Sequence, residues 1–147
     1  MGKEPSTFAQ AYFDTIDRFP EKEAVVSADD GRRYTYRQVH AEVKRLATAL
    51  QMLECKPGDK IAVWLANCPE WVFAEFACAL LGLVIVPVNA RFRAEEAAYV
   101  LKSSSAKILL MQPNFLSNNY LERLYEIGDG NIGQDHLSSL QSNQLHA

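Results

Sequence analysis

The first fifth of the chain carries apolar residues at helical spacing, followed by two short extended stretches. A first helix is predicted with Ser6 as its N-cap and Pro20 as its stop. Residues Ala24–Ala28 and Arg32–Tyr36 predict a β-hairpin, because the Asp30-Gly31 pair between them favours a tight turn with positive φ angles. The apolar face expected for the first helix consists of Phe8, Tyr12, Phe13, Ile16 and Phe19.

A long amphipathic helix is predicted next. Thr35, followed three residues later by Gln38, fits a capping box, in which the two side chains bond each other's backbone N–H groups. The helix is expected to end before Pro57-Gly58. Its inward positions are Val39, Val43, Leu46, Ala47, Leu50 and Leu53.

The middle of the chain repeats a strand–helix pattern. Strand–helix–strand segments with short connections predict right-handed βαβ units and a parallel sheet, so the fold class is α/β with an N-terminal helix and a β-hairpin. Asn67 and Glu70 fit a second capping box. The predicted strands are Lys60–Ala66, Leu83–Pro87 and Lys107–Met111, and the predicted helices are Pro69–Leu81, Ala94–Lys102 and Phe115–Ile127.

The longest apolar run, Phe76–Val88, predicts no transmembrane segment. A spanning helix needs about 20 apolar residues, and this run is shorter. Gly82 and Pro87 also interrupt it, which favours the end of a buried helix followed by a β-branched strand.

Both ends of the chain are predicted to lie outside the folded region. Residues 1–5 read as a disordered N-terminus, although the start MGKEPS also fits a loose myristoylation pattern at Gly2. The polar stretch Gly128–Ala147 is predicted to be a flexible tail. It contains a literal GxGxxG, Gly128–Gly133, but a dinucleotide site needs those glycines between a strand and a helix. Nucleotide binding through these glycines is therefore the minor alternative.

Composition narrows the function classes. The chain has 147 residues, and 15 basic against 18 acidic side chains give a net charge of −3, which argues against a nucleic-acid partner. The three cysteines, Cys55, Cys68 and Cys78, form no CxxC pair. This pattern predicts neither a disulfide framework nor a zinc site, and it favours a cytoplasmic location.

Nucleophilic and metal chemistry find little support in the sequence. No GxSxG elbow is present, and Ser103–Ser105 falls at a predicted helix end, where serines commonly bond carbonyl groups. His40 lies within a predicted helix, while His136 and His146 lie in the predicted tail, without neighbours at metal-ligand spacing. We therefore predict no catalytic residue and no metal site, and the cysteines are expected to be small core residues.

One loop carries candidate binding residues. Asn89, Arg91 and Arg93 follow a predicted parallel strand, at the edge where open α/β sheets place ligands. Two arginines there could bind a phosphate or carboxylate of a cofactor. The alternative is that they pair with Glu95 and Glu96 or face solvent.

Four segments of the sequence, taken in chain order, resemble segments of a known protein family. They resemble the N-terminal region of adenylate-forming acyl-CoA synthetases, most closely the fatty-acid and related carboxylic-acid ligases, over about residues 6–127. The resemblance implies that 6–127 is a partial N-terminal subdomain of a larger adenylate-forming domain and that 128–147 lies outside the family pattern. The stretches are Arg32–Val43, Pro57–Trp71, Ala79–Glu96 and Ser104–Gln112.

The resemblance also implies a chemistry. Such enzymes use ATP and Mg²⁺ to convert a carboxylic acid to an acyl-adenylate and then transfer the acyl group to coenzyme A. Their TSGTTGxPKG-like phosphate loop has no counterpart here, so no catalytic residue is carried over. We expect the chain alone to bind none of these cofactors and to be catalytically incomplete.

The predicted helix Pro69–Leu81 is apolar nearly all round and so needs cover on all sides. Three parallel strands and a hairpin are too few to cover this helix on all sides. We therefore expect self-association or association with a missing portion. The alternative is a non-enzymatic interaction module that binds a partner through an exposed apolar face.

Overall fold

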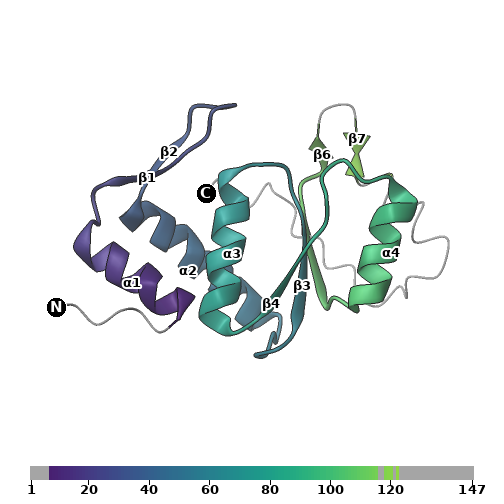
Figure 1. The fold of residues 1–147 in the computed structure, drawn as a ribbon, viewed down its shortest axis with the longest axis horizontal. Helices are drawn as coiled ribbons and strands as arrows, with labels where there is room; N and C mark the ends of the chain where they lie inside the picture. Colours follow the sequence, from purple (N-terminus) through teal and green to yellow (C-terminus); the bar gives the residue numbers. More distant parts are fainter. Residues whose placement is uncertain (1–6, 116–117, 121, 123–147) are drawn as a thin grey trace. The chain divides into compact units, whose positions relative to one another are not determined.

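The computed structural model describes residues 7–115, 118–120 and 122. Its elements divide between two compact units, which we call the helical unit (residues 1–58 and 68–83) and the sheet unit (residues 59–67 and 84–147). The mixed α/β class, the N-terminal helix, the hairpin and the parallel sheet are confirmed (Figure 1).

The helical unit packs three helices beside one hairpin. Helix α2 contacts α1, α3 and both strands of the hairpin. The core of the helical unit is formed by buried apolar residues from all three helices. The elements are α1 (Phe8–Arg18), β1 (Glu23–Val26), β2 (Arg33–Thr35), α2 (Tyr36–Met52) and α3 (Pro69–Leu81).

Helix α1 begins one residue later than the Ser6 cap predicts. The N-cap is Thr7, whose hydroxyl accepts a hydrogen bond from the Gln10 N–H at 3.1 Å. Of the five apolar positions predicted to face inward, Tyr12 and Ile16 are buried. The others, Phe8, Phe13 and Phe19, are 41–54% exposed, and Phe19 is the C-cap residue beyond the helix.

The capping box that opens α2 is confirmed. The Thr35 hydroxyl accepts from the Gln38 N–H at 3.3 Å, and the Gln38 side chain accepts from the Thr35 N–H at 2.8 Å. Four of the six predicted inward positions are buried, namely Val39, Val43, Ala47 and Leu50. The remaining two, Leu46 and Leu53, are partly buried.

The hairpin forms, but its turn is not the predicted one. Strands β1 and β2 pair antiparallel, while the chain between them makes a wider loop in which the Gly31 N–H bonds the Ser27 carbonyl. Gly31 has a φ of 73°, whereas Asp30 is not among the residues with positive φ. The Asp30 carboxylate instead accepts a hydrogen bond from the Arg32 N–H at 3.1 Å, a contact typical of Asp in a turn.

Helix α3 has the predicted bounds but a different start. Its N-cap is Cys68, which makes no side-chain capping bond, so the predicted Asn67–Glu70 box is wrong. Glu70 binds Arg32 of the hairpin instead. The helix ends at Gly82 in the left-handed region, at φ 66°.

The apolar run Phe76–Val88 splits as predicted. Helix α3 ends at Leu81, and strand β4 (Val84–Pro87) begins three residues later. Across residues 7–115, 118–120 and 122, the helices fall short of the length and hydropathy that crossing a bilayer requires.

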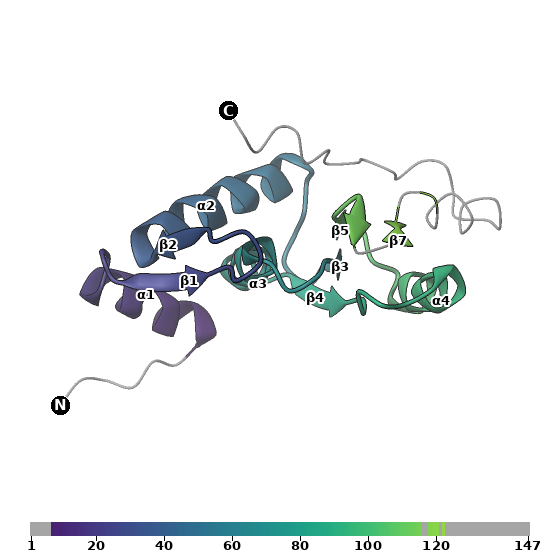
Figure 2. The same ribbon diagram turned by 90° about the horizontal axis from the view of Figure 1, so that it is seen from above.

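In the sheet unit, a three-stranded parallel sheet packs against one helix (Figure 2). The strand order is β4-β3-β5, with β3 (Lys60–Trp64) central and buried from its second residue onward. Helix α4 (Ala94–Ser104) connects β4 to β5 (Ile108–Met111). The core between sheet and helix is centred on Ala62, Trp64, Val88, Ala97 and Tyr120.

The chain after β5 departs from the predicted helix Phe115–Ile127. Two short strands, β6 (Asn114–Phe115) and β7 (Asn118–Asn119), pair antiparallel, and the described residues that follow them, Tyr120 and Glu122, are helical. The start of the predicted helix is therefore wrong, because Phe115, Asn118 and Asn119 lie in paired strands. The rest of that helix, residues 1–5 and the stretch Gly128–Ala147 with its glycine motif lie outside the described residues.

Candidate functional site

The candidate loop, residues 88–93, leaves the carboxyl end of β4 and leads into α4. Because β3, β4 and β5 are parallel, their carboxyl ends meet at one edge of the sheet. Val88 is buried, and its N–H donates to the Val63 carbonyl at 2.9 Å, so the loop starts as a continuation of the sheet. The sequence-predicted location of this loop is confirmed.

Asn89 organises the loop through both its backbone and its side chain. Its carbonyl accepts from the Trp64 indole Nε1 at 3.1 Å and from the Phe92 N–H at 3.0 Å. Its side-chain Oδ1 accepts from the Arg91 N–H at 2.9 Å. These bonds assign Asn89 to shaping the loop, since its acceptor oxygens are already engaged.

Two buried aromatic side chains donate hydrogen bonds to carbonyl groups of this loop. The sequence analysis did not identify either of them. Trp64 and Tyr120 are fully buried, and their rings stack with centroids 4.5 Å apart. The Tyr120 hydroxyl donates to the Ala90 carbonyl. A Trp at the end of an otherwise aliphatic strand was the available signal, because a buried indole N–H needs an acceptor.

Arg91 and Arg93 carry the remaining charge of the loop. Both side chains are exposed, and across the described part of the chain neither guanidinium forms an ion pair. Glu96 instead accepts from the backbone N–H of Arg93, the N-cap of α4, at 2.9 Å. Of the two alternatives to ligand binding, the structure therefore favours exposure to solvent over pairing with Glu95 or Glu96.

An open hollow lies beside this loop, on the surface of α4. Its lining combines apolar side chains with two carboxylates that would repel a phosphate. The hollow therefore does not extend an anion site around the arginines. Its lining residues are Phe92, Glu95, Glu96, Tyr99 and Val100.

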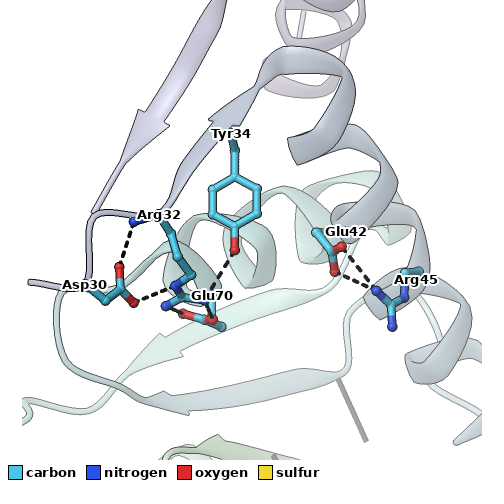
Figure 3. Close-up of polar contacts among 6 residues, drawn as sticks. All are labelled: Asp30, Arg32, Tyr34, Glu42, Arg45 and Glu70. Carbon is cyan, nitrogen blue, oxygen red and sulfur yellow. Dashed lines mark hydrogen bonds and ion pairs between the residues drawn. The ribbon is translucent and has the colours of Figure 1, made fainter. Parts of the chain in front are cut away.

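A second polar cluster joins the hairpin to the start of α3 (Figure 3). Arg32 lies between two carboxylates: its guanidinium donates to both oxygens of Glu70, at 2.5 and 3.3 Å, and through Nε to Asp30 at 2.5 Å. It also donates to the Tyr34 hydroxyl at 3.3 Å. The cluster links hairpin to helix, and its charges are already partnered.

The ionisation of these groups follows from their partners. The hydrogen bond to Glu70 raises the pKa of Arg32. Burial is the largest single influence on Glu70 and opposes its ionisation, but the bond from Arg32, the backbone hydrogen bond and the bond from Cys68 together outweigh burial and lower the pKa of Glu70 below its ordinary value. Hydrogen bonds from Ser27 and from the Arg32 backbone lower the pKa of Asp30 to about 2. All three are therefore charged at neutral pH, as a structural ion cluster requires.

Burial also shifts the pKa values of two further titratable side chains of the helical unit, Cys68 and His40. Burial raises the pKa of the Cys68 thiol to about 11, so it is protonated at neutral pH. The His40 Nδ1 lies 3.2 Å from the Tyr12 hydroxyl, and burial lowers the pKa of His40. Within the described ranges, His, Cys, Asp and Glu side chains do not gather in threes that could hold a metal ion.

The serines at the end of α4 behave as the sequence suggests. The Ser104 hydroxyl donates to the Leu101 carbonyl at 3.1 Å, and Ser105 ends the helix with a φ of 53°. Their place in the fold is to terminate a helix.

Comparison with known proteins places this fold in a family. The family model described as AMP-binding enzyme matches residues 12–144. Crotonobetaine/carnitine–CoA ligase of Escherichia coli is 36% identical over 109 residues, covering 72% of this chain and 21% of that protein. The mitochondrial medium-chain acyl-CoA ligase ACSF2 of Danio rerio is 30% identical over 122 residues, covering 83% of this chain and 20% of that protein.

Solved structures of related enzymes also resemble this fold. A fatty acyl CoA synthetase of Mycobacterium tuberculosis superposes with a TM-score of 0.67 at 29% identity, over 70% of this chain and 20% of that chain. The N-terminal subdomain of Klebsiella oxytoca NpsA, in complex with anthranilyl-AMSN, gives a TM-score of 0.66 at 28% identity, over 71% of this chain and 27% of that chain.

The chain spans about a fifth of the length of the curated relatives it matches. The matched range extends past Ile127 to residue 144, and so includes most of the stretch predicted to be a tail outside the family pattern. The resemblance to adenylate-forming acyl-CoA synthetases is confirmed. The chain belongs to the AMP-binding enzyme family and has the fold of the N-terminal subdomains of adenylate-forming enzymes.

Proposed function

We propose that this chain supplies scaffold for an ATP-dependent carboxylic acid–CoA ligase and is catalytically incomplete by itself. In the reaction, a carboxylate and ATP give an acyl-adenylate and pyrophosphate, and the thiol of coenzyme A then displaces AMP to give the acyl-CoA. Fatty acids are the proposed substrate class, supported by the named activities of the medium-chain ligase and the fatty acyl CoA synthetase.

The observation that supports the proposal is that the polar side chains of the described residues bind one another or their own backbone. Displacing pyrophosphate requires groups aimed at phosphate oxygens, usually with Mg²⁺ to spread the charge. The described residues do not fit such a site, because the carboxylates and guanidinium of the Asp30–Arg32–Glu70 cluster bind one another and Asn89 shapes its own loop. Within this part of the chain, no cluster of carboxylates could hold a metal ion.

Arg91 and Arg93 are the positions at which this chain would contact an anionic group of ATP or coenzyme A. They are exposed on a loop that Trp64 and Tyr120 fix from the core. A fixed loop holds its guanidinium groups with little loss of entropy on binding. Their role would be to attract or orient the anion and not to take part in bond breaking.

The proposed location is the cytoplasm. No disulfide joins the described cysteines, which suits a reducing compartment.

A second candidate function, a non-enzymatic interaction module, is favoured by one observation. Several large apolar side chains of the helical unit are exposed, and Met52 is 80% exposed. Sedimentation of the chain tests this second function. Self-association or capture of the rest of a ligase fits either, whereas a stable monomer that binds no partner counts against the module.

The test of the proposed ligase function is ATP–pyrophosphate exchange with a series of fatty acids. We expect no exchange from the purified chain, and exchange once it is combined with a relative's polypeptide lacking the matching first fifth. A chain carrying Leu50→Asp, purified in the same way, controls for contaminating ligase because it breaks a fully buried core position. Exchange by the chain alone but not by this control would refute the claim of incompleteness.

A further inference from the structure

Helix α4 packs against the parallel sheet with its inner side (Figure 2). Ala97 is fully buried in the core between helix and sheet. The outer side of the helix carries three exposed side chains, Glu95, Tyr99 and Lys102, which we call the α4 stripe. Their spacing of four and then three residues places them on one face of the helix.

Tyr99 stands at the middle of the α4 stripe. Its side chain is 74% exposed. Aromatic rings gain from burial, and tyrosine is enriched at protein interfaces. The open hollow described above borders Tyr99 on the side of Glu95 and includes the apolar side chains of Phe92 and Val100. A projecting ring beside an apolar hollow is a surface against which a partner's side chains can pack.

The α4 stripe has opposite charges at its two ends. Glu95 lies in the first turn of α4, and Lys102 lies in the last turn. They are seven residues apart, about 10 Å along the helix axis, which is too far for an ion pair within the helix. Across the described ranges, neither side chain takes part in an ion pair. Both charges are therefore available to a partner.

A second copy of this chain has the complementary order of charges. If two copies of α4 pack antiparallel around a two-fold axis at Tyr99, the first turn of each helix faces the last turn of the other. Glu95 then lies opposite Lys102 of the second copy, and the symmetry repeats this contact at the other end. A parallel pair would instead bring like charges together, which is unfavourable.

The hollow fits the same arrangement. It lies at the acidic half of the α4 stripe, so the basic half of the second copy lies over it. The apolar stem of Lys102 can contact the apolar lining while its ammonium group reaches the carboxylates of Glu95 and Glu96. The two Tyr99 rings meet near the axis, where an offset stack is favourable.

We propose that the outer face of α4 is a self-association surface, on which the α4 stripe docks antiparallel against the α4 stripe of a second copy. Tyr99 forms the centre of this two-fold contact, and a Glu95–Lys102 pair forms each end. Helix α4 has 11 residues and is about 16 Å long. A contact this short is smaller than that of stable dimers, so we expect a reversible dimer with a dissociation constant of roughly 10 μM to 1 mM.

The test is sedimentation equilibrium of the full chain up to about 1 mM. Glu95→Lys and Lys102→Glu each give the stripe a single sign of charge, so each variant alone should associate at least about tenfold more weakly than the wild type. A one-to-one mixture of the two variants brings opposite charges together at both ends of the antiparallel pair. The mixture should therefore regain the wild-type association.

Matched controls make the same charge changes elsewhere. Asp29→Lys and Lys44→Glu lie at exposed positions of the helical unit, and both should associate as the wild type does, alone and mixed. Circular dichroism checks that every variant keeps its helix content. Tyr99→Ala should weaken association by roughly tenfold, whereas Tyr99→Phe keeps the ring and should retain it.

Three outcomes would overturn the proposal. The first is a wild-type chain that stays monomeric at about 1 mM. The second is association that Glu95→Lys and Lys102→Glu leave unchanged, which would assign it to another surface. The third is a mixture of these two variants that associates no better than either alone. These measurements involve no nucleotide and no acid substrate, so their failure is distinct from failure of the ligase proposal.

Discussion

The ion pair between Arg32 and Glu70 allows a quantitative test of how the helical unit is held together. It joins the hairpin to the N-terminal turn of α3 through two hydrogen bonds from one guanidinium. Arg32→Met and Glu70→Gln remove the charges while keeping most of the side-chain volume. The pair Glu42 and Arg45, also drawn in Figure 3, is the matched control because its residues lie three positions apart on one helix and so link no two elements.

The expected coupling follows from geometry and exposure. Hydrogen bonds to charged groups contribute about 1.5–3 kcal/mol when well shielded. Here each side chain is 35% exposed, so solvent screening reduces the expected coupling of Arg32 with Glu70 to about 1 kcal/mol. The control pair, three residues apart on α2, should couple by about 0.3 kcal/mol.

The assay is a double-mutant cycle for each pair, with urea unfolding followed by circular dichroism. Coupling between Arg32 and Glu70 should exceed that of the control and fall at about 1 M salt, where the Debye length is about 3 Å. Equal coupling for the two pairs would refute the assignment of Arg32 as the link between hairpin and helix.

Three further predictions concern single positions. Tyr120→Phe removes the donor to the Ala90 carbonyl and should lower the free energy of unfolding by about 1 kcal/mol in urea titrations, whereas Tyr99→Phe, at a side chain 74% exposed, should change nothing measurable. Thr35→Ala removes the N-cap of α2 and should cost about 1 kcal/mol in the same assay; no loss would contradict the capping box. Because the folded state lowers the pKa of His40, the unfolded chain takes up its proton first as pH falls below the ordinary value of 6.5. The melting temperature should therefore drop from pH 7.5 to 5, and His40→Gln should drop less; an equal drop would show that His40 is not responsible.

Elements with strong local signals were predictable from the sequence. Helix α3 has the predicted bounds because Pro69 suits the first turn and Gly82 suits a left-handed C-cap. The Thr35 capping box also needed only local information, since its partners are three residues apart.

The predictions from local motifs mostly failed where a side chain binds a residue far away in the sequence. Glu70 fits a capping box by spacing, but Arg32, 38 positions away, binds it instead. The turn at Asp30-Gly31 is an exception, because the Asp30 carboxylate is engaged by Arg32, which lies only two positions away. The candidate loop was located correctly, but its support from Trp64 and Tyr120 joins residues far apart in the sequence and gives no periodic signal.

The central claim is that this chain contributes framework, while the groups that bind the reacting nucleotide belong elsewhere in the enzyme. Isothermal titration of the purified chain with a non-hydrolysable fatty acyl-adenylate analogue and Mg²⁺ measures this directly. The claim predicts that the titration shows no saturable heat. Any residual binding should be weak and salt-sensitive, and the double variant Arg91→Ala with Arg93→Ala should remove it. One-to-one binding that persists at high salt and without those arginines would contradict it.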